Sequence, residues 1–469
     1  MNTASHPMRK ATAVMGLIGF AAILSFLPAE YALSIFGVIT LVVITWAFKY
    51  PLLYLTIFLI PFVGLTFNFS EFAFLRSLPF IGVWDAPIGD FIALTITIVF
   101  GMYLVHYERV KHIYHHIKDH LPAFKWYVPF LLVAILSIFR APRDMQMVSL
   151  QYFMRFVLFT YIAFVALPFW MVRTKKHLRT IIHVFVWSGI LVAIFGAISL
   201  FVGEPFWGIW RRVSPFVFAG IAPIGTNHNL LSEFLVTTIP LTFYVATHTH
   251  EHFKKWYMLA GISMIIITLL TFGRTAWIVL VVQLIALWWF IRPRDLSHKL
   301  LRAWPLLIVG AILVSYMAIF SASDFVKLST DSRLDLTRFS LIQAAQTPWI
   351  GRGIGTFIPT LGLSTAFSLE YGGPIEAHGF GQKLLFETGI IGLVFFIMFF
   401  MRMLFLLART WHESQNKDYR NLILATYITL IGALAFQVFN TSYFNAKLWF
   451  PVGLAWVVLY GKWKFNTKT

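Results

Sequence analysis

The sequence contains no cysteine, and only 12% of its 469 residues are charged. The absence of cysteine excludes disulfide bonds, thiolate catalysis and cysteine-based metal sites, and it leaves the redox compartment open. The scarcity of charge argues against a soluble globular protein, because 59% of the residues are hydrophobic and the mean hydropathy is +0.77. Such a composition is typical of a polytopic membrane protein.

Acidic residues are few as well: the chain has 19 Asp and Glu against 37 Lys and Arg, which gives a net charge of +18. In a soluble protein this excess would indicate nucleic-acid binding. Here most basic residues lie in short loops between apolar runs, which is the pattern of membrane topology signals. We therefore expect membrane lipid around the protein and no nucleic-acid partner.

Fourteen apolar runs in the sequence are candidates for crossing a bilayer, since a spanning helix needs roughly 17–25 residues. They centre near residues 20, 40, 59, 97, 133, 162, 192, 238, 264, 284, 312, 395, 431 and 454. The ninth and tenth runs share a tight turn and the last run is short, so twelve or thirteen spans are also possible. We predict an all-α polytopic membrane protein with about 12–14 transmembrane helices. Residues 1–469 would form a single integral membrane domain, with one large periplasmic loop at 321–383 that contains short helices.

If successive apolar runs cross the membrane in opposite directions, the loops that fall on one side of it are basic. If Arg9 and Lys10 are cytoplasmic, the following segments lie on the same side: 106–125, 172–180, 248–256, 292–303, 402–421 and the C-terminal tail. The positive-inside rule then predicts cytoplasmic N- and C-termini and places the 321–383 loop on the opposite side.

Two histidine-rich segments, 112–120 and 248–252, have spacings that a metal site could use. Both lie in predicted cytoplasmic loops without a nearby acidic cluster. We interpret both as solvated loops and expect no metal site in the protein.

The polar loop begins with DSRLDLTRFSLIQAAQTP, which predicts a short helix. Ser332 and Asp335 have the spacing of a capping box, and Pro348 would end the helix. The predicted apolar face consists of Leu334, Arg338, Leu341, Ile342 and Ala345. On that face Arg338 needs a partner, either an anionic ligand or a structural acid such as Asp335.

Several arginines lie on the predicted non-cytoplasmic side, where the positive-inside rule disfavours basic residues. Their presence there indicates a role other than setting the membrane topology. Guanidinium groups bind phosphate oxygens bidentately, and a gathered set would suit a diphosphate. Arg274 lies at a tight turn, where it points into the bundle or else reaches the membrane interface. Arg211, in the 203–228 loop, is a further candidate, whereas Arg333 could be an ordinary exposed helix charge.

Histidine could supply the proton transfer that arginine cannot. His378 lies in a glycine-rich turn just before an apolar run, which suits a general base, although a structural histidine is an equal alternative. His228 is a second candidate, and its neighbours Asn227 and Asn229 resemble helix caps. The glycines of GRGIGTF, residues 351–357, indicate loop architecture, because no lysine and serine follow them as in a phosphate-binding loop.

These motifs, in this order, resemble the O-antigen ligase and O-antigen polymerase superfamily of bacterial membrane glycosyltransferases. The resemblance rests on TFGRTAW with Arg274, the arginine-rich helix before TPWIGRGIGTF, and the run from His378 into LLFETGIIGLVFF. The segment PIGTNHNLLSEFLVTTIP also looks similar to a span start of the family, so that the resemblance covers roughly residues 220–400. It differs at Gly379, where family members commonly have asparagine after the histidine.

The resemblance implies transfer of a glycan from an undecaprenyl-diphosphate carrier to a hydroxyl acceptor in the periplasm, without metal or cofactor. Arg274 with Arg338 or Arg333 would hold the diphosphate, and His378 would act as the base. A ligase would use the lipid A core of lipopolysaccharide as acceptor, and a polymerase another repeat unit. The single dominant loop favours the ligase, whereas fourteen spans exceed the twelve typical of a ligase. A transporter or flippase for lipid-linked sugars is the alternative from another class.

Overall fold

The computed structural model describes residues 43–68, 85–106, 124–202, 205–207, 210–290, 324–364, 375–441 and 444–461, together with positions 37 and 40. Several predictions lie outside these residues, namely the apolar runs near 20 and 312, the histidine-rich segment 112–120, Arg9 and Lys10, and most of the C-terminal tail.

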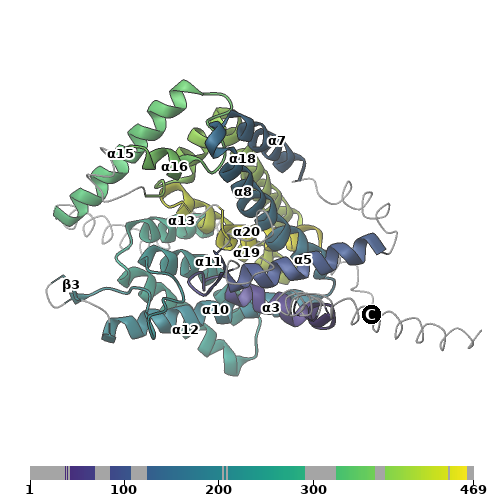
Figure 1. The fold of residues 1–469 in the computed structure, drawn as a ribbon. Helices are drawn as coiled ribbons and strands as arrows, with labels where there is room; N and C mark the ends of the chain where they lie inside the picture. The colour runs from purple at the N-terminus through teal and green to yellow at the C-terminus, as the bar shows by residue number, and fades with distance from the viewer. Residues whose placement is uncertain are drawn as a thin grey trace, which may run out of the picture.

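The described chain is built almost entirely of helices (Figure 1). The first half contains α3 (Lys49–Leu59), α5 (Ile88–His106), α7 (Phe124–Arg140), η2 (Arg143–Met145), α8 (Gln146–Tyr152), η3 (Phe153–Phe159), η4 (Ile162–Ala166), α9 (Leu167–Met171) and α10 (Lys175–Val202). The second half contains α11 (His228–Thr247), α12 (Glu251–Leu270), α13 (Arg274–Phe290), α15 (Asp324–Gln346), α16 (Phe357–Gly362), α18 (Phe380–Glu413), α19 (Lys417–Phe439) and α20 (Ala446–Tyr460). Two short antiparallel pairs complete it: β1 (Thr66–Asn68) with β2 (Asp85–Pro87), and β3 (Pro205–Trp207) with β4 (Trp210–Arg211).

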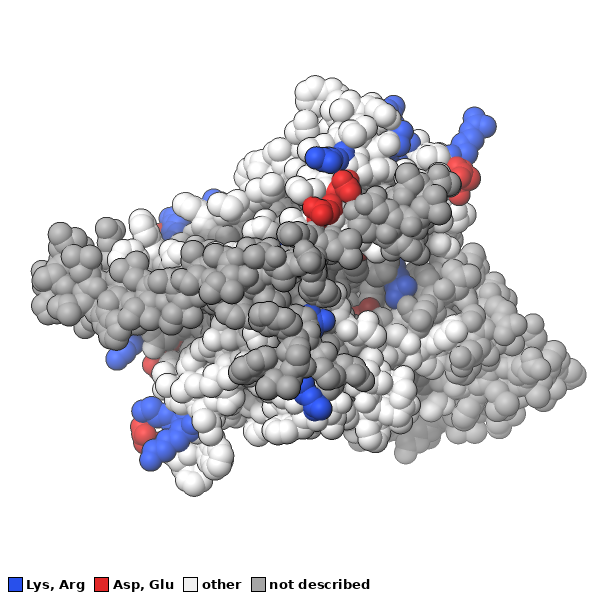
Figure 2. Space-filling view, turned by 90° about the vertical axis from the view of Figure 1, so that its left-hand side faces the viewer, with Lys and Arg blue, Asp and Glu red and all other residues white. Residues whose placement is uncertain are grey.

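Six described helical stretches are long and apolar enough to cross a membrane, judged by length and composition. They are Arg143–Met171, α10, α11, α12, α18 and α19, and shorter apolar helices of 10–17 residues accompany them. Uncharged side chains make up most of the described surface in Figure 2, with charged groups at scattered positions. The predicted all-α polytopic membrane class is therefore confirmed.

The core of the bundle surrounds α20, which packs between α19, α18, α11 and the η4–α9 segment. Apart from Lys447 its sequence is apolar on every side, and all its residues from Ala446 to Leu459 are buried. Trp449 and Trp456 are among the largest fully buried side chains of the described chain. Because a helix buried on all faces cannot shift without repacking its neighbours, α20 fixes the positions of the helices around it.

The predicted start and face of the polar-loop helix were wrong. The helix, α15, begins at Asp324, so Ser332 lies inside it, although it does end at Gln346, just before Pro348. Its buried face carries Leu336, Ser340 and Ala344, whereas the predicted stripe of Leu334, Arg338, Leu341, Ile342 and Ala345 is exposed. The Ser340 hydroxyl is satisfied within the helix by the carbonyl of Leu336, at 2.7 Å, so this polar face can pack without an external partner.

A small second core joins α15 to the bundle. Leu336 and the partly buried Phe339 of α15 meet Phe357 of α16 and Phe386 of α18. The rings of Phe339 and Phe386 stack with centroids 5.9 Å apart, and Phe357 meets Phe386 edge to face at 5.3 Å. These contacts hold α15 against the first turns of α18.

Helix α18 is interrupted at Gly389, where the backbone has φ +67° and ψ −171°. The glycine-rich loop of residues 347–355 fills the interruption. The amides of Arg352 and Gly353 donate to the carbonyls of Phe386 and Glu387, at 2.9 and 3.0 Å, and the amide of Ile390 donates to the carbonyl of Pro348 at 2.8 Å. These hydrogen bonds replace those that the helix loses at the break. The role of loop architecture predicted for these glycines is confirmed.

Candidate functional site

Arg274, Arg333 and His378 come together from three separate elements. Arg274 is the first residue of α13, Arg333 lies in the middle of α15, and His378 lies in the turn before α18. Burial lowers the pKa of Arg333, and the positive charge of Arg274 lowers it further. Arg333 in turn acts electrostatically on His378. The cluster therefore combines two guanidinium groups and one imidazole from residues up to about a hundred positions apart in the chain.

His378 is a neutral imidazole at pH 7. Burial, and then the nearby charge of Arg333, lower the pKa of His378 from its usual 6.5 to about 4. Within the described part of the chain, neither ring nitrogen of His378 forms a hydrogen bond. The side chain therefore keeps a nitrogen lone pair that can accept a proton from a bound hydroxyl.

Arg212 and His228 extend the cluster. The sequence offered His228 only as a second candidate for the base, and it favoured Arg211 over Arg212 for binding the diphosphate. His228 begins α11, where the side chain of Asn227 caps the helix by accepting from the amide of Asn229 at 2.8 Å. Both Arg212 and Arg333 act electrostatically on His228. Burial lowers the pKa of Arg212, which shows that this arginine is drawn partly out of solvent.

Arg211, predicted to bind the diphosphate, does not share the environment of Arg212. It is exposed, and its guanidinium donates to the backbone carbonyl of Phe201. Successive side chains of an extended backbone point in opposite directions, so only one of two adjacent arginines can face the cluster. The sequence shows the adjacent pair but does not indicate which member faces inward.

Arg338 was also predicted to bind the diphosphate, and the structure does not bring it to the cluster. Its side chain is 76% exposed and pairs with Asp335 on the same helix at 3.5 Å. Arg338 follows Arg333 by five residues, which at ~100° per residue places it about 140° further round the helix. The two arginines therefore lie on opposite sides of α15, and Arg333 is the one that faces His378.

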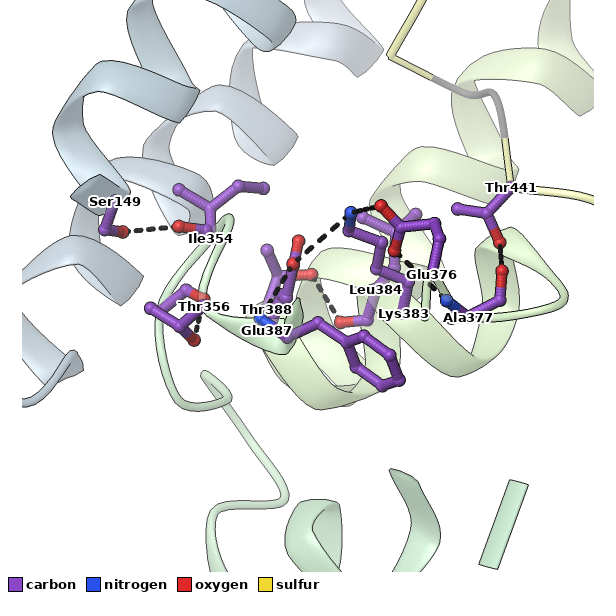
Figure 3. A network of polar contacts seen from close by, with 12 residues as sticks. Ser149, Ile354, Thr356, Glu376, Ala377, Lys383, Leu384, Glu387, Thr388 and Thr441 are labelled. Carbon is purple, nitrogen blue, oxygen red and sulfur yellow. Dashed lines mark hydrogen bonds and ion pairs between the residues drawn. The ribbon is translucent and has the colours of Figure 1, made fainter. Parts of the chain in front are cut away.

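Lys383 forms a buried ion network beside the turn that carries His378 (Figure 3). Its ammonium lies 2.8 Å from the Glu376 carboxylate and 3.8 Å from that of Glu387, and it sits above the rings of Tyr152 and Phe444 at 4.9 and 5.0 Å. The Glu376 carboxylate also accepts from the amide of Ala377 at 3.1 Å. Lys383 thus ties the turn to the membrane helix that follows it.

The same network reaches the glycine-rich loop. Glu387, which is fully buried, accepts from the amide of Phe357 at the start of α16, at 3.4 Å. Sequence reasoning missed Lys383, yet a signal was present: a lysine and a glutamate four residues apart in an apolar helix are costly unless they are paired.

A second buried ion pair supports the first turns of α11. Lys447 lies 3.6 Å from Glu233 and donates to the carbonyl of Leu230 at 2.9 Å, while Gln437 donates to Glu233 at 2.6 Å. All three polar side chains are at most 1% exposed. They hold α11 against α19 and α20, and so fix the end of α11 that presents His228.

The described residues contain no group of three or more His, Asp or Glu that could hold a metal ion. In the segment 248–252, His248 bonds locally to the hydroxyl of Thr247 and the carbonyl of Tyr244, both at 2.9 Å.

Comparison with protein families shows that residues 259–397 match the family model described as O-antigen ligase. The matched segment contains Arg274, Arg333 and His378, whereas Arg212 and His228 precede it. This match supports the resemblance to the O-antigen ligase superfamily that the motifs predicted. No curated protein matches the chain.

Proposed function

We propose that the protein transfers a glycan from an undecaprenyl-diphosphate carrier to a hydroxyl acceptor at the periplasmic face of the inner membrane, as an O-antigen ligase does with the lipid A core. The observation that carries the proposal is the position of Arg333. It lies within electrostatic reach of Arg274 and of two histidines, in a segment that matches the O-antigen ligase family model. The basic loops on the opposite side support a periplasmic location.

The arginines would bind the diphosphate of the donor. Arg274, Arg333 and Arg212 are all partly buried, and the positive charge of Arg274 disfavours the charged form of Arg333. The Nε atom of Arg333 is buried without a hydrogen-bond partner among the described residues, so it remains available to a phosphate oxygen. A diphosphate would relieve the repulsion and satisfy this donor.

His378 would act as the general base. As the acceptor oxygen forms a bond to the anomeric carbon of the donor sugar, the hydroxyl proton passes to the neutral imidazole. The bond between the anomeric carbon and the diphosphate oxygen breaks, and its electron pair leaves with the diphosphate. The arginines stabilise the negative charge that develops there, and the partly buried surroundings strengthen this effect.

A reconstituted assay tests the proposal. Purified protein in liposomes receives an undecaprenyl-diphosphate-linked glycan together with either a lipid A core acceptor or a second repeat unit. We expect His378→Ala to abolish transfer while donor binding remains, because the arginines are intact. Full transfer by His378→Ala would remove the proposed base, and glycan translocation without transfer would favour the flippase. A single adduct on lipid A core indicates a ligase, whereas a ladder of repeats indicates a polymerase.

Two arginines of the same helix provide a matched pair. Arg333→Gln should weaken donor binding by about ten- to a hundredfold, since it removes a charge-assisted contact worth about 1.5–3 kcal/mol. Arg338→Gln, which changes an exposed arginine of α15, should bind the donor as the wild type does. Equal effects of the two substitutions would contradict the assignment of Arg333.

A further inference from the structure

The turn that carries His378 is held by a residue distant in the sequence, Thr441, which follows α19. The Thr441 hydroxyl accepts from the amide of Gly379 at 2.8 Å. It also donates to the carbonyl of Ala377 (Figure 3). These two backbone groups lie on either side of His378. One buried hydroxyl therefore restrains the backbone both before and after the histidine.

Close packing accompanies these hydrogen bonds. A Cβ atom at Gly379 would lie 2.6 Å from the carbonyl oxygen of Val438 in α19, so only glycine allows this approach. This contact gives a physical reason for glycine directly after His378. It brings the turn onto the end of α19, within reach of the Thr441 side chain.

The other end of the turn is held by the Lys383 network, through Glu376. The imidazole itself forms no hydrogen bond within the described chain, so no hydrogen bond of its own holds the ring in place. The place of the ring beside Arg333 therefore depends on the backbone of the turn.

We propose that Thr441 is a positioning residue for His378, whose hydroxyl fixes the turn so that the imidazole stays beside Arg333 and faces the acceptor. This inference rests on the proposed role of His378 as a base. Thr441 itself touches neither substrate nor reacting atoms.

The test uses Thr441→Val, which keeps the shape of the side chain and removes the hydroxyl, and Thr441→Ser, which keeps the hydroxyl. We expect Thr441→Val to lower kcat by about ten- to a hundredfold, the effect of a small displacement of a catalytic group. The KM for the lipid-linked donor should not change, because the arginines are untouched. Thr441→Ser should restore most of kcat.

A matched control is Thr426→Val. Thr426 is also buried on α19, but its hydroxyl bonds only to the carbonyl of Leu422 in its own helix, at 2.8 Å. It should leave kcat unchanged. If Thr441→Val does not fold, Thr441→Ala replaces it, since alanine removes the hydroxyl and adds no bulk.

The pH profile separates positioning from general loss of structure. If the imidazole moves away from Arg333 in Thr441→Val, its pKa rises toward 6.5, and the acidic limb of kcat/KM moves to higher pH. A purely structural defect would lower the amount of active protein without moving the limb.

The inference is overturned if Thr441→Val retains wild-type kcat and pH profile, if Thr441→Ser is equally impaired, or if Thr426→Val shows the same loss. His378→Ala in the same assay distinguishes the two proposals. Transfer by His378→Ala contradicts the proposed function, whereas an inactive His378→Ala beside a fully active Thr441→Val contradicts only the role of Thr441.

Discussion

Arg333 lies near Arg274 and near two histidines, His378 and His228. The charge of Arg274 acts on Arg333, and the charge of Arg333 acts on both histidines. A cation close to an imidazole disfavours the protonated form, so the histidine stays neutral well below its ordinary pKa. In the proposed mechanism Arg333 serves two purposes: it binds the anionic donor, and it keeps His378 ready to accept a proton.

This dual role predicts a particular pH dependence. Because the pKa of His378 is about 4 in the free protein, the acidic limb of kcat/KM should lie near pH 4 rather than 6.5. Arg333→Gln removes a positive charge, which favours the imidazolium form, raises the pKa and moves the limb to higher pH. The profile is measured by transfer rates between pH 4 and 8. A limb that does not respond to Arg333→Gln would contradict the coupling.

Lys383 allows a prediction about stability. Removal of one partner from a buried ion pair leaves the other charge uncompensated, which costs about 3–5 kcal/mol. Lys383→Met should therefore lower the midpoint of thermal unfolding in detergent, because Glu387 stays buried. Lys254→Met, which breaks an exposed pair with Glu251, is the control and should cost about 0–1 kcal/mol. Similar midpoints for the two variants would argue against a stabilising role for the buried pair.

At the level of single residues, the sequence predicted Arg274 from its place at a tight turn, His378 from its glycine-rich turn before an apolar run, and Arg333 only as an alternative to Arg338. It did not predict Lys383 and Thr441 as partners of the turn. Thr441 lies 62 residues from Gly379, and only the packing of α19 against the turn brings them together. Periodicity placed Arg338 on the apolar face of the helix and so predicted that it would be buried. The structure shows that this face is exposed, and therefore periodicity could not have removed Arg338 from the candidates for diphosphate binding.

At the level of helices, the break in α18 is the feature with the clearest test. Gly389 has positive φ, and a Cβ atom there would lie 2.4 Å from the backbone carbonyl of Trp349. Gly389→Ala should destabilise the protein by about 1–3 kcal/mol, and more if the loop is displaced. Gly381, in the same helix, has open space around its Cβ position, so Gly381→Ala is the control. Unfolding midpoints in detergent compare them, and equal midpoints would contradict the strain at Gly389.

Most helices of the described chain were predictable, since their apolar runs match the predicted positions. The buried face of α15 was not predictable. Its sequence carries an apolar stripe and also a more polar face, on which the hydroxyl groups of Thr337 and Ser340 donate to carbonyls of the same helix. Amphipathic pattern alone predicts that the apolar stripe is buried. In this helix Leu336 and Phe339 pack onto α18, so the face that carries them is buried and the apolar stripe is exposed.

At the level of the whole molecule, the predicted orientation can be tested with the cysteine-free chain, which needs no prior substitutions. Arg338→Cys lies at an exposed position of α15, and Glu251→Cys at an exposed position at the start of α12. If the site is periplasmic, a membrane-impermeant thiol reagent should label Arg338→Cys in intact spheroplasts and Glu251→Cys only after lysis. The reverse pattern would place the arginine cluster in the cytoplasm.

The interruption of α18 has a mechanical consequence. Residues 380–388 are joined to the 347–355 loop by hydrogen bonds across the break at Gly389. The loop is held in turn by the bundle, because Ile354 accepts from the Ser149 hydroxyl of α8 at 2.6 Å and its amide donates to the Ser137 hydroxyl of α7 at 3.0 Å. The break therefore links the first turns of α18, and the histidine turn before them, to α7 and α8 as well as to the end of α19.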